Sequence, residues 1–124
     1  MASLDERITT FSRDGLHFDV TDEGPLGGDV VVLLHGFPTD RTSWDRVATR
    51  LHEAGLRTLA PDQRGYSPGA RPSDRDAYRL DELVADVLAL VDASGRERVH
   101  LVGHDWGGAL AWLVAGNHPT RIAS

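Results

Sequence analysis

The sequence predicts an α/β fold with a mostly parallel, twisted sheet and helices on both faces. Short apolar segments at Val30–Leu34, Leu56–Ala60 and Val99–Val102 alternate with segments of helical length. Continuous apolar runs of this kind are typical of strands buried on both faces of a parallel sheet. The alternation of strands with helices favours a parallel sheet with crossover helices.

The composition is that of an ordinary soluble globular protein. The 124 residues are 40% hydrophobic and 26% charged, which suits one modest domain, so we expect residues 1–124 to form a single domain. The net charge of −6 argues against nucleic acid and against an anionic membrane as partners. The absence of cysteine excludes thiolate chemistry and favours a cytoplasmic location. No segment resembles a signal peptide or is long enough to span a bilayer.

The N-terminal third predicts a hairpin followed by the first strand and helix. Ile8–Phe11 and Leu16–Thr21 alternate in polarity and are separated by a turn that contains Asp14-Gly15. The helix is expected to begin at Thr42 as N-cap and to end at Gly55. Its buried face would hold the apolar residues at helical spacing, Trp44, Val47, Ala48 and Leu51.

The rest of the chain predicts a loop, a helix and a strand that leads into a last helix. In the loop, at 61–72, Asp62 and Arg64 are expected to pair across a turn. The helix over 80–93 would bury its apolar side chains, Leu80, Leu83, Val84, Val87, Leu88 and Val91. The last helix is apolar all round, which predicts an interior position. Residues 121–124 are expected to approach a further strand.

The turn between the strand at Val99–Val102 and the last helix carries the candidate chemistry. Gly103, Gly107 and Gly108 flank it, where a chain that reverses from strand to helix leaves no room for Cβ atoms. The pattern is that of a nucleophile elbow, with Asp105 where serine is usual. Aspartate is ionised at neutral pH, and the N-terminus of the helix favours that charge. An ionised carboxylate attacks electrophilic alkyl carbon to form an ester, which water then hydrolyses with a general base and oxyanion donors.

Other interpretations of this turn are weaker. Asp105 alone would be an ordinary helix N-cap, but the flanking glycines and the buried strand before it favour catalysis. A phosphate-binding turn does not fit, because the glycine spacing differs and a carboxylate repels phosphate. A serine esterase does not fit, because no serine lies in an elbow. No histidine pattern predicts a metal site, and no cofactor is expected.

Three motifs give the chain a resemblance to a known family. They are His35-Gly36-Phe37-Pro38, Pro61-Asp62-Gln63-Arg64-Gly65-Tyr66 and Gly103-His104-Asp105-Trp106-Gly107-Gly108. Together they resemble the α/β-hydrolase fold, and within it the epoxide-hydrolase-like branch, from about Val30 to the end of the chain. The resemblance implies a small-molecule substrate (an epoxide or a related alkyl electrophile) and Asp105 as nucleophile. It also implies oxyanion donors at the Phe37 and Trp106 amides, substrate contacts from His35, Pro38, His104 and Trp106, and a Phe37–Pro38 bond that can be cis.

The resemblance leaves alternatives open. Haloalkane dehalogenases share the Asp-Trp pair, but many have Asn where this chain has Phe37. The family's acid, histidine base and lid follow the nucleophile, whereas the one later histidine here, His118, lies about 20 Å along the helix from Asp105. We therefore expect the N-terminal half of an α/β-hydrolase, a partial core domain that forms the ester at best and does not turn over. A non-catalytic fragment that needs a complementing chain is the other reading. An open sheet edge at the strand before the elbow would favour self-association.

Overall fold

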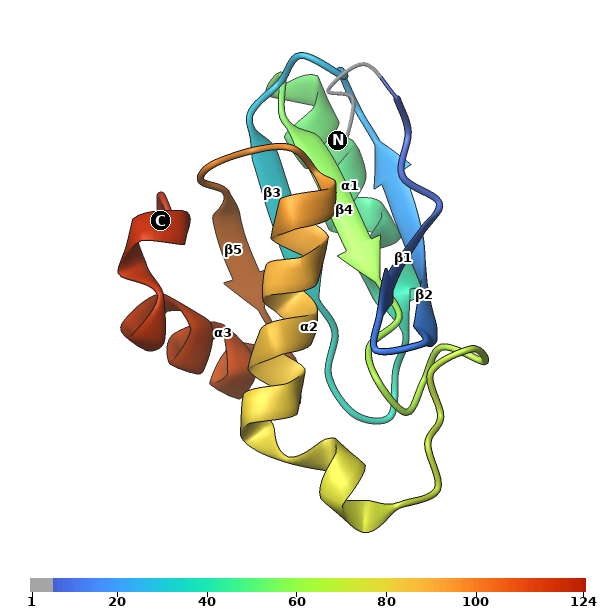
Figure 1. The fold of residues 1–124 in the computed structure, drawn as a ribbon. Helices are drawn as coiled ribbons and strands as arrows, with labels where there is room; N and C mark the ends of the chain where they lie inside the picture. Colours follow the sequence, from blue (N-terminus) through green and yellow to red (C-terminus); the bar gives the residue numbers. More distant parts are fainter. Residues whose placement is uncertain (1–5) are drawn as a thin grey trace.

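A computed structural model describes residues 6–124, which form one five-stranded mixed sheet with helices on both faces (Figure 1). The strand order is β1-β2-β4-β3-β5. Strands β4, β3 and β5 run parallel to one another. The N-terminal hairpin adds two antiparallel strands, β1 and β2, beside β4. The predicted α/β class and the hairpin are confirmed.

The hairpin consists of β1 (Thr10–Arg13) and β2 (Leu16–Glu23). Asp14 and Gly15 connect the strands and both have positive φ, 50° and 78°. A two-residue turn of this hand matches the twist of the paired strands, which is why Asp-Gly predicts a hairpin well. Phe11 and Phe18 face each other across the pair, with ring centroids 4.6 Å apart.

The parallel strands are β3 (Val30–Leu34), β4 (Arg57–Pro61) and β5 (His100–Gly103). The central strand, β3, is buried along its whole length, as its continuous apolar run predicts. Alternate side chains point to opposite faces, so the strand contributes to two apolar clusters. Because β3 lies between β4 and β5, its C-terminal end reaches the turn that follows β5.

One face of the sheet is covered by α1 (Asp45–Glu53), which a 3-10 turn, η1 (Arg41–Trp44), precedes. The N-cap of α1 is Trp44, whereas Asp40 caps η1 by accepting from the Thr42 N–H, so the prediction of Thr42 as N-cap was wrong. Trp44, Ala48 and Leu51 pack against the sheet as predicted, but Val47 is exposed. The two-residue shift arises because the aspartate side chain caps the 3-10 turn before the helix begins.

The opposite face is covered by α2 (Leu80–Ala93) and, beside it, α3 (Trp106–Asn117) (Figure 1). A 3-10 turn, η2 (Arg75–Tyr78), leads into α2. Helix α2 has the predicted bounds, but Leu80 is 54% exposed, whereas Leu90 and Asp86 are buried. The first turn of α2 extends beyond the end of the sheet (Figure 1), so Leu80 has no strand to pack against.

The expectation that α3 lies in the interior was wrong. Only Gly107, Leu110 and Val114 are buried, and Trp112 is 83% exposed. Helix α3 packs with one face on the sheet and α2, and among residues 6–124 no element covers its outer face. The apolar sequence of α3 therefore did not indicate which of its faces would be buried against other elements.

Strand β5 is the last strand of the sheet, as expected, but its edge is partly paired. After η3 (Pro119–Arg121), the segment 122–124 runs parallel to the start of β5. Leu101 N–H donates to the Ser124 carbonyl over 2.9 Å, and Ala123 N–H donates to the Val99 carbonyl over 2.8 Å. The expected approach to a further strand is confirmed, and it satisfies the first half of the β5 edge.

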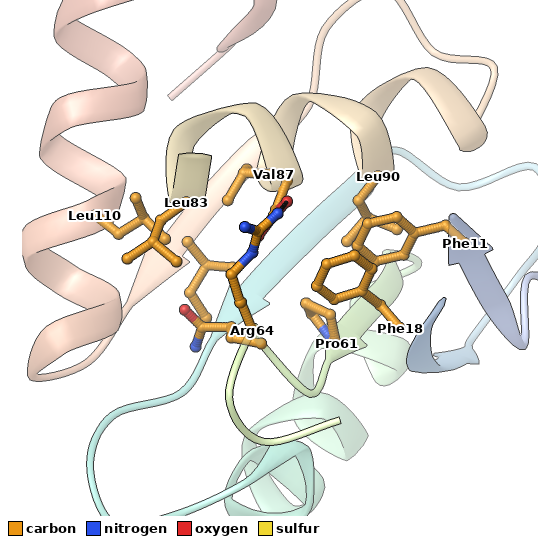
Figure 2. Close-up of a pocket in the computed structure, with 11 residues that line it drawn as sticks. Phe11, Phe18, Pro61, Arg64, Leu83, Val87, Leu90 and Leu110 are labelled. Atoms are coloured by element: carbon orange, nitrogen blue, oxygen red, sulfur yellow. Dashed lines mark hydrogen bonds and ion pairs between the residues drawn. The ribbon is translucent and has the colours of Figure 1, made fainter. Parts of the chain in front are cut away.

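Buried ion pairs connect the loop after β4 to its surroundings, and they are not the predicted pair. Asp62 binds Arg41, whereas Arg64 makes a two-point contact with Asp86 of α2 at 2.8 and 2.9 Å. Figure 2 shows Arg64 extending toward α2 beside Leu83 and Val87. The prediction that Asp62 and Arg64 pair with each other was wrong, because each side chain finds a partner far away in the sequence.

Candidate active site

The site is built on the turn between β5 and α3, at the C-terminal ends of the parallel strands. Asp105 occupies this turn with φ 58° and ψ −124°, in the left-handed half of conformational space. Such a conformation costs a non-glycine residue about 1–3 kcal/mol, so the surrounding structure must enforce it. The turn leaves the Asp105 side chain exposed at the end of the sheet.

Close backbone packing enforces the turn. A Cβ on Gly103 would lie 2.3 Å from the Gly107 carbonyl oxygen, and one on Gly107 would lie 2.2 Å from the Leu34 carbonyl oxygen. Gly108 differs, because a Cβ there would meet its nearest atom at an ordinary 3.4 Å, so the prediction of a third sterically required glycine was wrong. Gly36 meets this criterion instead: its Cβ would lie 2.5 Å from the Asp105 Cβ.

Two backbone N–H groups converge on one oxygen of the Asp105 carboxylate. Trp106 N–H donates to Oδ2 over 2.7 Å, and Phe37 N–H donates to the same atom over 3.1 Å. These hydrogen bonds, led by the one from Trp106, lower the pKa of Asp105 below its ordinary value. The carboxylate is therefore ionised at neutral pH. Both N–H groups that the resemblance implied as oxyanion donors reach Asp105, and that role stays a prediction.

The loop after β3 presents the second of these donors. The Phe37–Pro38 peptide bond is cis, in agreement with the prediction, and the Phe37 side chain is 65% exposed. Pro38 is also exposed beside the turn. His35 lies beneath this loop and is 1% exposed, so the structure places it as a buried support of the site.

A hollow of about 150 Å³ opens beside the turn. It lies between the loop after β4 and the first turns of α2 and α3, and its lining includes Tyr66, Leu80 and Trp106. Burial and the nearby Asp105 carboxylate raise the pKa of Tyr66, so its hydroxyl stays protonated beside that negative charge. The Trp106 side chain is 67% exposed at the rim. Tyr66 belongs to the second of the three sequence motifs, whereas Leu80 belongs to a segment that the sequence did not assign to the site.

Neither His104 nor His118 lines the hollow beside Asp105. The His104 side chain lines a separate hollow with Thr39, Trp44 and Val47. His118 caps the C-terminal end of α3, the end farthest from Asp105. Substrate contacts from His35, Pro38, His104 and Trp106 stay predictions. Within residues 6–124, no group of three potential ligand side chains is arranged to hold a metal, and no helix is long and apolar enough to cross a membrane.

Comparison with curated proteins relates the chain to epoxide hydrolases. It is 41% identical to epoxide hydrolase A of Mycobacterium tuberculosis over 124 residues, which are all of this chain and 38% of that protein. It is 47% identical over 96 residues to epoxide hydrolase B of the same organism, covering 77% of this chain and 27% of that one. The chain thus spans well under half the length of these relatives.

Solved structures give the same result. An epoxide hydrolase from Vigna radiata superposes with a TM-score of 0.87 at 36% identity, covering 93% of this chain and 35% of that one. Epoxide hydrolase A from Mycobacterium thermoresistibile gives a TM-score of 0.87 at 37% identity, covering 92% and 36%. Residues 29–124 match the family described as the α/β hydrolase fold. The strand order, the strained aspartate turn and these matches show that the chain belongs to the α/β hydrolase fold family, where it resembles epoxide hydrolases.

Proposed function

We propose that this protein belongs to an epoxide-opening hydrolase that works through a covalent alkyl ester on Asp105. One observation carries the proposal: the Phe37 and Trp106 N–H groups both bind Oδ2 of the carboxylate. This leaves Oδ1 with no hydrogen bond among the described residues and directs it away from the two donors. The similarity to proteins named epoxide hydrolases supports the choice of substrate class.

The chemistry assigns a different role to each carboxylate oxygen. Oδ1 attacks an epoxide carbon, the ring C–O bond breaks, and the ring oxygen keeps the electron pair and takes up a proton. Oδ2 becomes the carbonyl oxygen of the ester. When water attacks the ester carbon, negative charge develops on Oδ2, where the Phe37 and Trp106 N–H groups stabilise it. Collapse of this intermediate releases a diol and restores the carboxylate.

The described residues supply the first step better than the second. Water attack on the ester needs a general base within hydrogen-bond reach. His35 is buried with its ring nitrogens next to backbone groups, and His118 lies at the other end of α3. We therefore expect this chain to form the ester and retain it.

Intact mass spectrometry of the purified chain after incubation with styrene oxide tests the proposal. We expect one added styrene oxide, located on Asp105 by peptide mapping. Asp105→Asn should abolish the adduct, whereas Asp45→Asn, which removes an exposed carboxylate at the start of α1, should leave it unchanged. An adduct that survives in Asp105→Asn would refute Asp105 as the nucleophile.

A parallel incubation with a primary alkyl bromide separates the two substrate classes. Free acetate reacted with both reagents gives the intrinsic ratio of their rates. A ratio on Asp105 that favours the epoxide beyond the acetate ratio supports the epoxide hydrolase. A ratio shifted toward the bromide would support a haloalkane dehalogenase instead.

We also propose that the chain self-associates through an apolar surface beside β5. This surface, the edge face, combines side chains of β5, α3 and the C-terminal segment: Leu101, Val102, Ala111, Trp112, Ala115 and Ile122. It borders an open hollow of about 350 Å³, and Trp112 is almost fully exposed there. A contiguous apolar surface at a sheet edge favours contact with another apolar surface.

A further inference from the structure

The Gly36–Phe37 peptide unit is held by an unusual number of donors. Its carbonyl oxygen lies next to His35 Nδ1 at 3.0 Å, Thr39 Oγ1 at 2.8 Å and Thr39 N at 3.1 Å. The N–H of the same peptide unit donates to Asp105 Oδ2. Because a peptide unit is planar and rigid, fixing its carbonyl also fixes the direction of its N–H.

The partners of His35 determine its protonation. Nε2 lies 3.2 Å from the Gln63 backbone N–H, which can only donate, so Nε2 must accept. The proton of the neutral ring is then on Nδ1, which donates to the Gly36 carbonyl. With the ring 1% exposed, this assignment uses both nitrogens and leaves neither to water.

Gln63 fixes the other side of the same loop. Its side-chain amide donates to the His35 carbonyl over 2.6 Å, while its backbone N–H fixes the His35 ring. The Tyr66 ring meets the His35 ring edge-on at 4.6 Å. The loop after β4 thereby supports the loop after β3 through both the buried imidazole and the backbone carbonyl of His35.

The two donors on Asp105 differ in how they are held. Trp106 N–H belongs to the first turn of α3, so the helix itself orients it. Phe37 N–H belongs to an exposed loop and has no such support from regular structure. Phe37 N–H, which has no helix to orient it, belongs to the peptide unit whose carbonyl accepts the hydrogen bonds from His35 and Thr39.

We infer that His35 is a positioning residue which, as its Nδ1–H tautomer, orients the Gly36–Phe37 peptide so that Phe37 N–H points at Asp105 Oδ2. Polarisation of the carbonyl by its donors also strengthens the N–H on the opposite side of the peptide. The orientation itself is a property of the chain, and only its benefit to ester chemistry rests on the proposed function.

The first test needs no substitution. Long-range ¹H–¹⁵N correlation spectra of the chain at neutral pH distinguish the two neutral tautomers and the cation. We expect His35 to show a protonated Nδ1 and an unprotonated, accepting Nε2. A protonated Nε2, or a cationic ring, would overturn the inference whatever the substituted chains do.

A matched pair of substitutions isolates the Nδ1 donor. In His35→Asn the side-chain amide can lie near the position of Nδ1 and donate to the Gly36 carbonyl. In His35→Gln the amide lies near the position of Nε2, where it can accept from Gln63 but does not replace Nδ1. Both variants lose the imidazole and its contact with Tyr66, so the difference between them reports on the donor.

We expect hydrogen exchange of the Phe37 amide to be about tenfold faster in His35→Gln than in His35→Asn, since one oriented hydrogen bond is lost. The carboxyl pKa of Asp105 should rise in His35→Gln only. Equal exchange and equal Asp105 titration in the two folded variants would overturn the inference. Thr39→Val removes a donor to the same carbonyl from an exposed residue and should accelerate Phe37 exchange in the same direction.

The result is separable from that of the proposed function. If the spectra and exchange rates agree with the inference but styrene oxide does not alkylate Asp105, the positioning role stands and the proposed chemistry fails. If Asp105 is alkylated equally fast in the Asn and Gln variants while their Phe37 exchange is the same, the chemistry stands and the positioning role fails.

Discussion

Asp105 combines three properties that seldom occur in one residue. It has a positive φ, its carboxylate is exposed, and one of its oxygens accepts two backbone N–H groups. An N-cap role would explain the bond from Trp106 but not the one from Phe37, which comes from a different loop. Strain maintained by close-packed glycines, together with converging donors, is typical of a residue held in place for chemistry.

At Gly36, one methyl group should disrupt this arrangement. A Cβ there would lie 2.5 Å from the Asp105 Cβ and 2.9 Å from the His104 carbonyl oxygen, so the two loops must separate. We expect Gly36→Ala to lower the free energy of unfolding by about 1–3 kcal/mol, the usual cost of overpacking. It should also reduce alkylation of Asp105 at least tenfold, because Phe37 N–H moves away from Oδ2.

Gly116 in α3 is the matched control, because a Cβ there would meet no atom within 4 Å. Gly116→Ala should raise the free energy of unfolding by about 0.5–1 kcal/mol, since alanine loses less conformational entropy in a helix. Urea denaturation measures both variants. Equal stability of the Gly36→Ala and Gly116→Ala chains would contradict the steric argument.

Among the elements, α2 is joined to the loop after β4 by a buried ion pair. Arg64 binds Asp86 at two points and also donates to the Ala77 carbonyl over 2.6 Å. Arg13 of β1 reaches the same Asp86 carboxylate at 3.2 Å. One carboxylate therefore connects a strand, a loop and a helix, and its partner Arg64 lines the hollow beside Asp105.

Removal of Arg64 should be costly because Asp86 stays buried and keeps only the longer contact with Arg13. We expect Arg64→Met to lower the free energy of unfolding by about 3–5 kcal/mol, or to leave the chain unfolded without urea. Arg50→Met removes an arginine from the exposed pair with Glu53, 3.8 Å apart, and should change stability by less than about 0.5 kcal/mol. Circular dichroism during urea titration compares the two. A loss below about 1 kcal/mol for Arg64→Met would show that the pair is not a structural requirement.

At the scale of the whole molecule, we propose that the edge face governs association in solution. Trp112 is 83% exposed within it, next to the half of β5 that segment 122–124 does not reach. On the other side of the sheet, Val47 of α1 is also an exposed apolar side chain, at 45%, and it lies outside the edge face. The two positions allow a direct test of which face associates.

We expect the mass of the chain, measured by light scattering after size exclusion, to rise with concentration. Trp112→Glu should shift the rise to concentrations about tenfold higher, because association would bury a charge within an apolar contact. Val47→Glu should leave it unchanged. A constant monomer mass, or an equal effect of both substitutions, would refute self-association through the edge face.

Local sequence pattern determined most of the secondary structure. The bounds of β3 were predicted to the residue and those of α2 approximately, because apolar pattern and flanking glycines act over one strand or one helical turn. The Asp-Gly hairpin turn was predicted because both of its residues adopt positive φ, and the Asp105 turn was predicted because close backbone approach requires glycine at Gly103 and Gly107. The motifs also identified the two N–H groups that meet at the Asp105 carboxylate, although their catalytic role stays a proposal.

Tertiary structure decided which groups become neighbours. With thirteen basic and nineteen acidic side chains, the sequence could not show that Arg64 selects Asp86, 22 residues away, over the nearby Asp62. It could not show that α3 would keep an uncovered face, because an apolar helix carries no record of its neighbours. The tautomer of His35 likewise depends on the backbone N–H of Gln63, in the loop after β4. Periodicity is local, whereas pairing, burial and proton position are set by atoms that only folding brings together.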